Sequence, residues 1–341
     1  MRAIGDDERR TLLHHLRAPD DTAAVDLVRR LRVAGVPPEQ LLVDLIAPVQ
    51  VCVGELWQRN RMSVVSEHLA SGISERLVAT ALADAPLPPH RGDVLMACAE
   101  GEWHALAARL VADVLRLRGW RVRFLGAAVP AAQLAPCGAE LRPRAALVSA
   151  TMASRLPQVT HAVGRCRRVG LPTMVGGAAF RSDGALGRRV GADAWAPDGA
   201  VAAGLLEHWP PPPAPDPVVP VDEEYPLLSR ERWRLIDDAM RLLTRGYAPL
   251  RGFSPGRLDS TIAELDHLLD FLASAVFLDD EAVFVDFARW LGETLDAHDE
   301  PVELVETVLT GLADLLGDRP RTRRILLAGR AALGERTVAH A

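Results

Sequence analysis

The chain has 341 residues, of which 49% are hydrophobic and 25% are charged, and its formal net charge is −6 at pH 7. This length and composition are those of a folded globular protein with two or three domains, and they exclude a largely disordered chain. The negative net charge disfavours a surface dedicated to nucleic acid or to anionic membranes. The sequence shows neither an apolar signal core near its start nor an uninterrupted apolar run of membrane-spanning length, so we expect a cytoplasmic protein.

The first part of the chain, residues 1–86, has apolar residues at helical spacing and lacks strand-like alternation. Turns rich in Pro, Asp and Asn separate these stretches. The pattern predicts a four-helix bundle. The expected helices cover residues 12–16, 23–33, 41–56 and 64–82.

Residues 87–209 alternate between short apolar runs and helix-period segments. This alternation predicts five parallel strands joined by crossover helices, which is a flavodoxin-like, doubly wound Rossmann-type sheet. The expected strands are 94–98, 121–125, 145–150, 173–175 and 192–196. The expected helices are 105–117, 131–141, 156–168, 184–189 and 200–208.

Residues 210–226 form a Pro-rich linker, which we expect to be extended and to mark a domain boundary. Residues 227–341 again have helical periodicity throughout and predict an all-α module, either a compact bundle or a globin-like domain. The expected helices are 229–245, 257–275, 281–297, 301–316 and 321–334.

The four cysteines do not form a metal-binding pattern. Each lies in an apolar segment without CxxC spacing, which predicts buried free thiols rather than disulfides or a zinc site. They are Cys52, Cys98, Cys137 and Cys166.

Chemically useful side chains follow three neighbouring strands of the predicted sheet. His104 lies in the first strand-to-helix turn, and Glu102 is placed to accept a hydrogen bond from one imidazole nitrogen and leave the other for a metal. Ser149 and Thr151 follow the third strand, and Gly176 and Gly177 the fourth. The carboxyl ends of parallel strands share one edge, where ligands bind. The alternative interpretation is a solvent-facing histidine with ordinary turn residues.

These stretches resemble a known family. Glu102-Trp103-His104 with Ala107, Ser149-Ala-Thr151 and Gly176-Gly177 are similar to the DxHxxG, SxL and GG motifs of base-off/His-on cobalamin-binding domains. The resemblance implies that His104 is the lower axial ligand of cobalt, that the displaced dimethylbenzimidazole tail is buried near Ser149, Thr151 and Gly176, and that Glu102, Trp103 and Gly177 also belong to the cobalamin site. Three residues depart from the pattern: Glu102 replaces Asp, Ala107 replaces Gly, and Thr151 stands where Leu is usual.

The predicted bundle carries a second resemblance. Trp57 and Val64, with the pair Glu67-His68, are similar to the W…EH signature of light-sensing, CarH-like B12 receptors. The resemblance implies that the four residues surround the 5′-deoxyadenosyl group of adenosylcobalamin, which an aromatic face and a polar pair suit chemically. The alternative is a core Trp with a solvated Glu-His pair. Gln58 stands where the receptors carry a histidine that captures cobalt after photolysis.

The C-terminal module looks like the globin-like, bilin-binding domain of the photocobilins, which follows a CarH-like module. The domain order, the linker and the aromatic stretches 271–277 and 284–291 carry this resemblance. Since the last cysteine is Cys166, biliverdin or a related bilin would bind noncovalently. The resemblance implies an apolar slot with polar groups. The candidates, each of which alone is also a core aromatic or solvated group, are His267, Phe287, Arg289, Trp290 and His298.

The leading hypothesis is a photoreceptor rather than an enzyme, in which light cleaves the Co–C bond of adenosylcobalamin and the bundle responds. The main alternative is a corrinoid protein that carries methylcobalamin in a methyltransferase system. A mutase is disfavoured without a substrate barrel, and a third possibility is a signalling adaptor whose C-terminal module binds no pigment. We expect a homo-oligomer, a dimer in preference, with a downstream signalling protein and without direct DNA binding, since the sequence begins at the bundle.

Overall fold

The computed structural model describes residues 4–86, 88–217, 219–246, 252 and 254–337. The chain divides into two compact units. Unit 1 comprises Met1–Thr151 and Gln158–Asp216, and unit 2 comprises Met152–Pro157 and Pro217–Ala341. The division after Asp216 falls inside the expected linker. Position 87, where we predict the first domain boundary, lies outside the described residues, so the predicted domain limits remain a proposal.

Unit 1 begins with helices that pack around one apolar core. They are α1 (Asp6–Arg17), α2 (Asp21–Val33), α3 (Pro38–Gln40), the π-helical turn η1 (Leu41–Ile46), α4 (Ala47–Gln58) and α5 (Val64–Leu82). The side chains of Asp20 and Ser63 accept hydrogen bonds from the first turns of α2 and α5, which explains where these helices begin. Because α3, η1 and α4 are continuous, the region has four helical stretches, at the positions that the periodicity predicts.

The continuous stretch Pro38–Gln58 differs from one expectation. It has 21 residues and a mean hydropathy of 1.3, so by length and composition alone it could cross a membrane. The sequence interpretation missed it because Asp44 and Gln50 interrupt the apolar run. Leu41, Leu45 and Ile46 of this stretch are fully buried in the bundle core. Core helices meet the same length and composition criteria, and these residues place one side of the stretch in the bundle core, whereas Val43 and Val51 are exposed.

The sheet of unit 1 confirms the predicted topology. Its strands are β1 (Gly92–Cys98), β2 (Trp120–Phe124), β3 (Ala145–Ser149), β4 (Thr173–Gly176) and β5 (Ala194–Trp195). They lie in the order β2-β1-β3-β4-β5, and every pair is parallel, which is the flavodoxin-like arrangement. The register pairs Cys98 with Ser149 and Ser149 with Gly176. The ends of β1, β3 and β4 are therefore level at one edge of the sheet.

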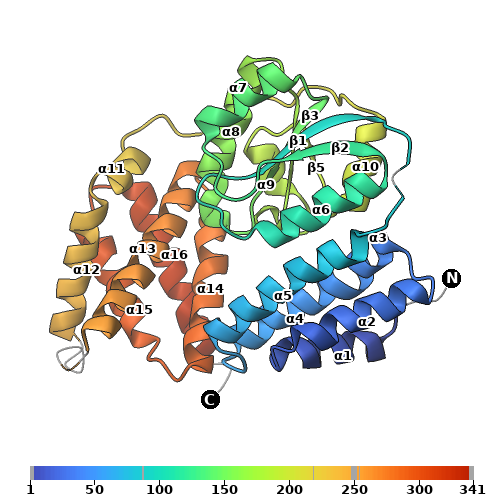
Figure 1. Ribbon diagram of the computed structural model, residues 1–341. Helices are drawn as coiled ribbons and strands as arrows, with labels where there is room; N and C mark the ends of the chain where they lie inside the picture. Colours follow the sequence, from blue (N-terminus) through green and yellow to red (C-terminus); the bar gives the residue numbers. More distant parts are fainter. Residues whose placement is uncertain (1–3, 87, 218, 247–251, 253, 338–341) are drawn as a thin grey trace. The chain divides into compact units, whose positions relative to one another are not determined.

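Helices cover both faces of this sheet (Figure 1). They are α6 (Ala105–Leu117), α7 (Ala131–Leu141), α8 (Leu156–Arg168), α9 (Ala185–Arg189) and α10 (Gly199–Glu207). The side chains of Val94, Met96 and Cys98 share a core with α6 and α10. The bundle core extends to α6 through Leu110 and Val114. Helix α6 thus packs against the sheet on one side and against the bundle on the other.

Unit 2 is mainly helical in the part that the structure describes. Its helices are α11 (Glu224–Arg230), α12 (Arg232–Gly246), α13 (Pro255–Leu278), α14 (Glu281–Ala297), α15 (Glu303–Leu315) and α16 (Pro320–Thr337). The predicted helix 229–245 is wrong in its start, because α11 is separate and begins earlier. Pro226 lies in the first turn of α11, where a missing amide hydrogen costs no helical hydrogen bond. The composition of the sequence instead predicts that Pro226 belongs to the linker.

Buried polar and aromatic contacts hold unit 2 together. Glu224 of α11 accepts hydrogen bonds from the backbone amide of Thr322 at 2.7 Å and from its hydroxyl at 2.8 Å, and so caps α16. The rings of Phe271 and Phe287 stack with centroids 4.0 Å apart. The short segment Met152–Pro157 belongs to this unit, where the Ser274 hydroxyl donates to its Ala153 carbonyl at 2.6 Å.

Candidate functional site

His104 lies at the start of α6 and is held by a buried carboxylate. Glu102 is 1% exposed, and its Oε1 lies 2.6 Å from His104 Nδ1 and accepts a hydrogen bond from the His104 backbone amide at 2.9 Å. The imidazole itself is 63% exposed. A carboxylate on Nδ1 fixes the tautomer in which Nε2 carries the lone pair, as in many metal-binding histidines. The chemistry of this donor fits a cobalt ligand.

The second carboxylate oxygen of Glu102 reaches another strand. Glu102 Oε2 accepts a hydrogen bond from the Thr151 backbone amide at 2.7 Å. Thr151 follows β3, so one buried side chain joins the turn after β1 to the turn after β3. Glu102 is one methylene longer than the Asp of the family motif, and both of its oxygens are used. Thr151 therefore contributes to the site through its backbone.

Gly176 and Gly177 permit a close approach of backbones at the end of β4. A Cβ on Gly176 would lie 2.7 Å from the Ala196 carbonyl oxygen, and one on Gly177 would lie 2.3 Å from that of Ala150. Gly177 also has a φ of +107°, which side chains rarely adopt. Any larger residue at either position would push the neighbouring backbone outward, so the paired glycines shape this edge of the sheet.

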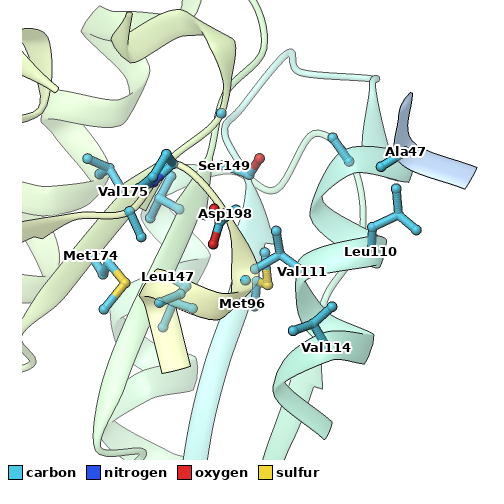
Figure 2. A pocket seen from close by; sticks show the side chains of 18 of the residues that line it. Ala47, Met96, Leu110, Val111, Val114, Leu147, Ser149, Met174, Val175 and Asp198 are labelled. Atoms are coloured by element: carbon cyan, nitrogen blue, oxygen red, sulfur yellow. The ribbon is translucent and has the colours of Figure 1, made fainter. Parts of the chain in front are cut away.

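An apolar cavity of about 230 Å³ opens beside these glycines. Its wall is formed by strand residues such as Met96 and Leu147, by α6 residues such as Val111, and by Ala47 of the bundle (Figure 2). Leu42 of the bundle also lines it. Engineered apolar cavities of about 150 Å³ accept benzene, so this one has room for a two-ring heteroaromatic group. The residues present therefore fit the dimethylbenzimidazole tail of a base-off cobalamin.

The cavity contains some of the predicted tail-binding residues and not others. Ser149, Gly176 and Gly177 line it, and so does Ala107, at the position of the family glycine. Trp103 is 77% exposed and does not line the cavity. Asp198 supplies the second polar lining side chain, and it caps α10 by accepting from the Val201 amide at 2.8 Å.

Sequence reasoning missed several lining residues. Leu42, Val43 and Ala47 belong to η1 and the start of α4, and their helical periodicity marks only a bundle core. The π-helical turn is a recognised mark of functional sites, but its hydrogen-bond pattern cannot be seen in a sequence. Gly199 was also missed. A Cβ there would lie 2.9 Å from the Val114 side chain, and its position after a capping Asp was the available signal.

The predicted adenosyl-pocket residues lie near the turn between α4 and α5. Trp57 is half-buried at the end of α4, and Val64 is exposed at the start of α5. Glu67 and His68 follow within the next turn, with His68 Nδ1 2.5 Å from Glu67 Oε2. The structure thus places an aromatic ring, an apolar side chain and a carboxylate–imidazole pair at one end of the bundle.

A chain of hydrogen bonds that the sequence did not reveal anchors Glu67. The Ser71 hydroxyl donates to Glu67 Oε1 at 2.8 Å, Gln50 Nε2 donates to Ser71 at 2.6 Å, and the Ser74 hydroxyl donates to Gln50 Oε1 at 2.9 Å. Ser74 is buried. In the sequence, the only sign of these hydrogen bonds is the presence of polar residues on otherwise apolar helix faces. Glu67 is therefore held from inside the bundle.

The predicted bilin residues are only partly brought together in unit 2. Phe287 is buried, and its ring lies 6.1 Å from that of Trp290. His267 and Arg289 are exposed, and His298 caps the end of α14. A cavity of about 60 Å³ in this unit is lined by leucines and valines together with Arg257, Glu264 and Glu300, and it includes none of the predicted residues.

The cysteine prediction is partly wrong. Cys98 and Cys166 are buried free thiols, but Cys137 is half-buried and Cys52 is exposed. Cys52 lies on α4 beside the exposed Val51. Its apolar sequence neighbours did not reveal which face of the helix it occupies.

Comparison with known proteins gives this site a family. Two models, each described as a B12 binding domain, match residues 92–205 and residues 8–81. The chain is 34% identical over 187 residues to the HTH-type transcriptional repressor CarH of Myxococcus xanthus, covering 53% of this chain and 61% of CarH. It is 36% identical over 129 residues to the repressor CarA of the same organism, covering 36% of this chain and 43% of CarA.

The chain therefore spans about three fifths or less of the length of these curated relatives. Both are named as transcriptional repressors, in agreement with the prediction that this chain is not an enzyme. The monomethylamine corrinoid protein of Methanosarcina barkeri has a similar structure, with a TM-score of 0.51 and 20% identity over 60% of this chain and all of that one. At this identity the likeness shows the fold alone. The two matched ranges, residues 8–81 and 92–205, together form a cobalamin-binding module that is similar in sequence to CarH.

Proposed function

We propose that this protein is a light sensor that binds adenosylcobalamin in the base-off/His-on form. The observation that carries the proposal is the Glu102–His104 pair, whose oriented imidazole stands at the sheet edge that also opens the 230 Å³ cavity. His104 Nε2 would coordinate the cobalt from below. The cavity beside Ser149, Gly176 and Gly177 would take the nucleotide tail. The cofactor supplies a Co–C bond that light can cleave.

The α4–α5 end of the bundle would bind the adenosyl group. The Trp57 ring offers a face for stacking and Val64 an apolar contact, and the anchored Glu67 and His68 offer hydrogen bonds to ribose or base. The bundle would have two arrangements, and only one of them would contact the adenosyl group. Loss of this group would therefore remove binding free energy from that arrangement alone. Only such a difference in binding free energy can shift the balance between them.

The second part of the proposal is a bilin bound in unit 2. The Phe271–Phe287–Trp290 stack would supply the apolar surface for a noncovalently bound biliverdin in a globin-like domain. The cavity in this unit is about 60 Å³, whereas ligand pockets hold roughly 300–1,000 Å³, so α13 and α14 would have to separate to admit it. Adding biliverdin to the purified chain and recording a red-absorbing band tests this step.

The remaining parts of the proposal concern the location of the protein, its oligomeric state and its partner. We infer a cytoplasmic homo-oligomer, a dimer in preference, that passes its signal to a partner protein and not directly to DNA. The net charge of −6 supports the last point, since DNA-binding surfaces are usually basic. Size measurement in the dark and after illumination tests whether subunits assemble or separate.

The decisive experiment uses apoprotein loaded with adenosylcobalamin in the dark. The expected result is a stable complex after gel filtration and a changed absorption spectrum after green light. His104→Ala should lose cobalamin. The matched control is His90→Ala, because His90 also pairs with a carboxylate, Asp93, at 2.8 Å. Retention of cobalamin by His104→Ala with an unchanged spectrum would contradict the proposal.

The alternative is a carrier of methylcobalamin, which the corrinoid-protein fold also allows. The two candidates differ at Trp57, because a methyl group needs no nucleoside pocket. Trp57→Ala should lower the affinity for adenosylcobalamin by about tenfold or more, since a stacked aromatic contributes roughly 1–3 kcal/mol, and should leave methylcobalamin binding unchanged. Equal losses for both cofactors would favour the carrier.

A further inference from the structure

The register of the sheet divides the cavity of unit 1 into a mouth and a floor. Ser149 and Gly176 are paired at the ends of β3 and β4, and they line the cavity at the edge of the sheet, which we call the mouth. Leu147 pairs with Met96 on one side and with Met174 on the other, and all three line the cavity. We call these three residues the floor row. They lie about 6.6 Å before the strand ends, on the same face of the sheet. Figure 2 shows them below Ser149.

The polar groups of the cavity are confined to its mouth. Among the lining residues that the structure describes, the only polar side chains are those of Ser149 and Asp198, and Asp198 is exposed between β5 and α10. The floor row is buried, and Val114 and Ala202 line the cavity with it. The backbone of the row pairs with neighbouring strands on both sides. An apolar cavity stays dry, so neither these described residues nor water offers a strong hydrogen bond at the floor.

The lower base of a corrinoid is the end of its nucleotide tail, so in this cavity its outer ring would reach the floor row. The outer ring of dimethylbenzimidazole presents only carbon, including two methyl groups, and methionine side chains contact such rings favourably. The outer ring of adenine carries ring nitrogens and an amine, which would lose their hydrogen bonds to water here. Each polar group that is buried without a partner weakens binding about tenfold or more. An apolar floor thus favours the first base over the second.

Met174 is the floor residue that a bound base would meet most directly. Gly176 follows it on the same strand and the same face, so β4 places no side chain between the mouth and Met174. At the corresponding positions β3 and β1 carry Ser149 and Cys98, which do have side chains.

We propose that the floor row, with Met174 as its specificity-determining residue, makes this chain selective for corrinoids whose lower base has an apolar outer ring. This inference rests on the proposed function, and it adds the class of corrinoid that the site accepts. The residues at the mouth would contact the ribose side of the tail, where hydrogen bonds are available from Ser149 and Asp198.

The test compares the dissociation constants of two adenosylated corrinoids, measured by absorbance in the dark. One carries adenine as its lower base. The other carries a cresol, which has an apolar outer edge and no nitrogen that could bind cobalt, so its affinity includes no cost of detaching the base. We expect wild type to bind the cresol form about tenfold or more tightly than the adenine form.

Two substitutions of Met174 separate polarity from packing. Met174→Gln keeps an unbranched side chain and brings an amide that can donate and accept at the floor. It should reduce the ratio of the two dissociation constants to about threefold or less. Met174→Leu is the matched control, because it conserves volume and stays apolar, and it should keep the wild-type ratio within about twofold. Any cost of detaching adenine from cobalt belongs to the corrinoid, so it cancels when this ratio is compared between variants.

Equal affinity of wild type for the two forms would overturn the inference, and this comparison does not depend on whether a variant folds. An unchanged ratio in a folded Met174→Gln protein would also overturn it. Both outcomes leave the proposed function standing, because both corrinoids are still bound. A wild-type chain that binds neither form, nor adenosylcobalamin, contradicts the proposed function and this inference together.

Discussion

The backbone amide of Thr151 donates a 2.7 Å hydrogen bond to the Glu102 carboxylate, which joins two strand ends of the sheet. The other oxygen of the same carboxylate holds the imidazole of His104. The position of the proposed cobalt ligand is therefore tied to the turn after β3. Changes at Glu102 should affect cofactor binding through His104 without removing the ligand itself.

Glu102→Gln should lower cobalamin affinity by about 10- to 100-fold, as the loss of supporting carboxylates does at other metal sites. The reason is that the NH2 group of Gln is itself a donor. It must face either the Thr151 amide or His104, and both of these also donate, so one hydrogen bond is lost. Titration followed by absorbance measures the affinity. Glu140→Gln on the exposed side of α7 is the control and should have no effect. An affinity within twofold of wild type would show that Glu102 is not needed to orient the histidine.

Gly177→Ala should destabilise unit 1 by about 2–4 kcal/mol, because of the left-handed φ and the contact with the Ala150 carbonyl. Urea unfolding of the apoprotein measures this loss. Gly204→Ala is the matched control, since Gly204 lies inside α10 with open space around it. It should be neutral or stabilise by up to about 1 kcal/mol. Equal effects of the two changes would refute the close approach at Gly177.

Gln50→Leu should destabilise the bundle by about 1–3 kcal/mol, because it leaves the buried Ser74 hydroxyl without its acceptor. The double variant with Ser74→Ala should recover part of this loss, since neither polar group then remains. Thermal unfolding of the two single variants and the double variant measures the coupling. If the loss of stability in the double variant equals the sum of the losses in the two single variants, the Gln50–Ser74 hydrogen bond contributes nothing.

The buried thiols should resist alkylation. Burial raises the pKa of Cys166 to about 12, and burial together with the nearby Glu102 carboxylate raises the pKa of Cys98 to about 12. At pH 8 a thiol reagent should label the exposed Cys52 in the native protein and reach Cys98 and Cys166 only after denaturant is added. Rapid native labelling of Cys98 would contradict its burial.

The same shifts predict the direction of a pH effect on stability. The unfolded chain ionises its thiols near pH 8.5 and the folded chain near 12, so the folded state keeps protons that the unfolded state loses. The stabilising contribution is complete below about pH 8 and is lost as pH rises toward 12. Urea midpoints between pH 8 and pH 10.5 should fall, and Cys166→Ala should make the fall less steep.

The sequence alone determined most of the secondary structure and the edge of the sheet at which the site lies. Apolar runs and helical periodicity are local properties, so strands such as β1 and helices such as α6 were predicted within a few residues. Parallel topology then placed His104, Ser149 and Gly176 at one edge, because the carboxyl ends of such strands must coincide.

The tertiary structure alone decided which groups meet. Neither the bond from Thr151 to Glu102 nor the path from Glu67 through Ser71 to Gln50 follows from spacing, because each joins residues on separate elements. The same holds for Leu42 and Ala47 in the wall of the cavity. A helical pattern shows on which side of its own helix a residue lies. The contact it makes depends on how neighbouring elements pack, and that is set by the whole core.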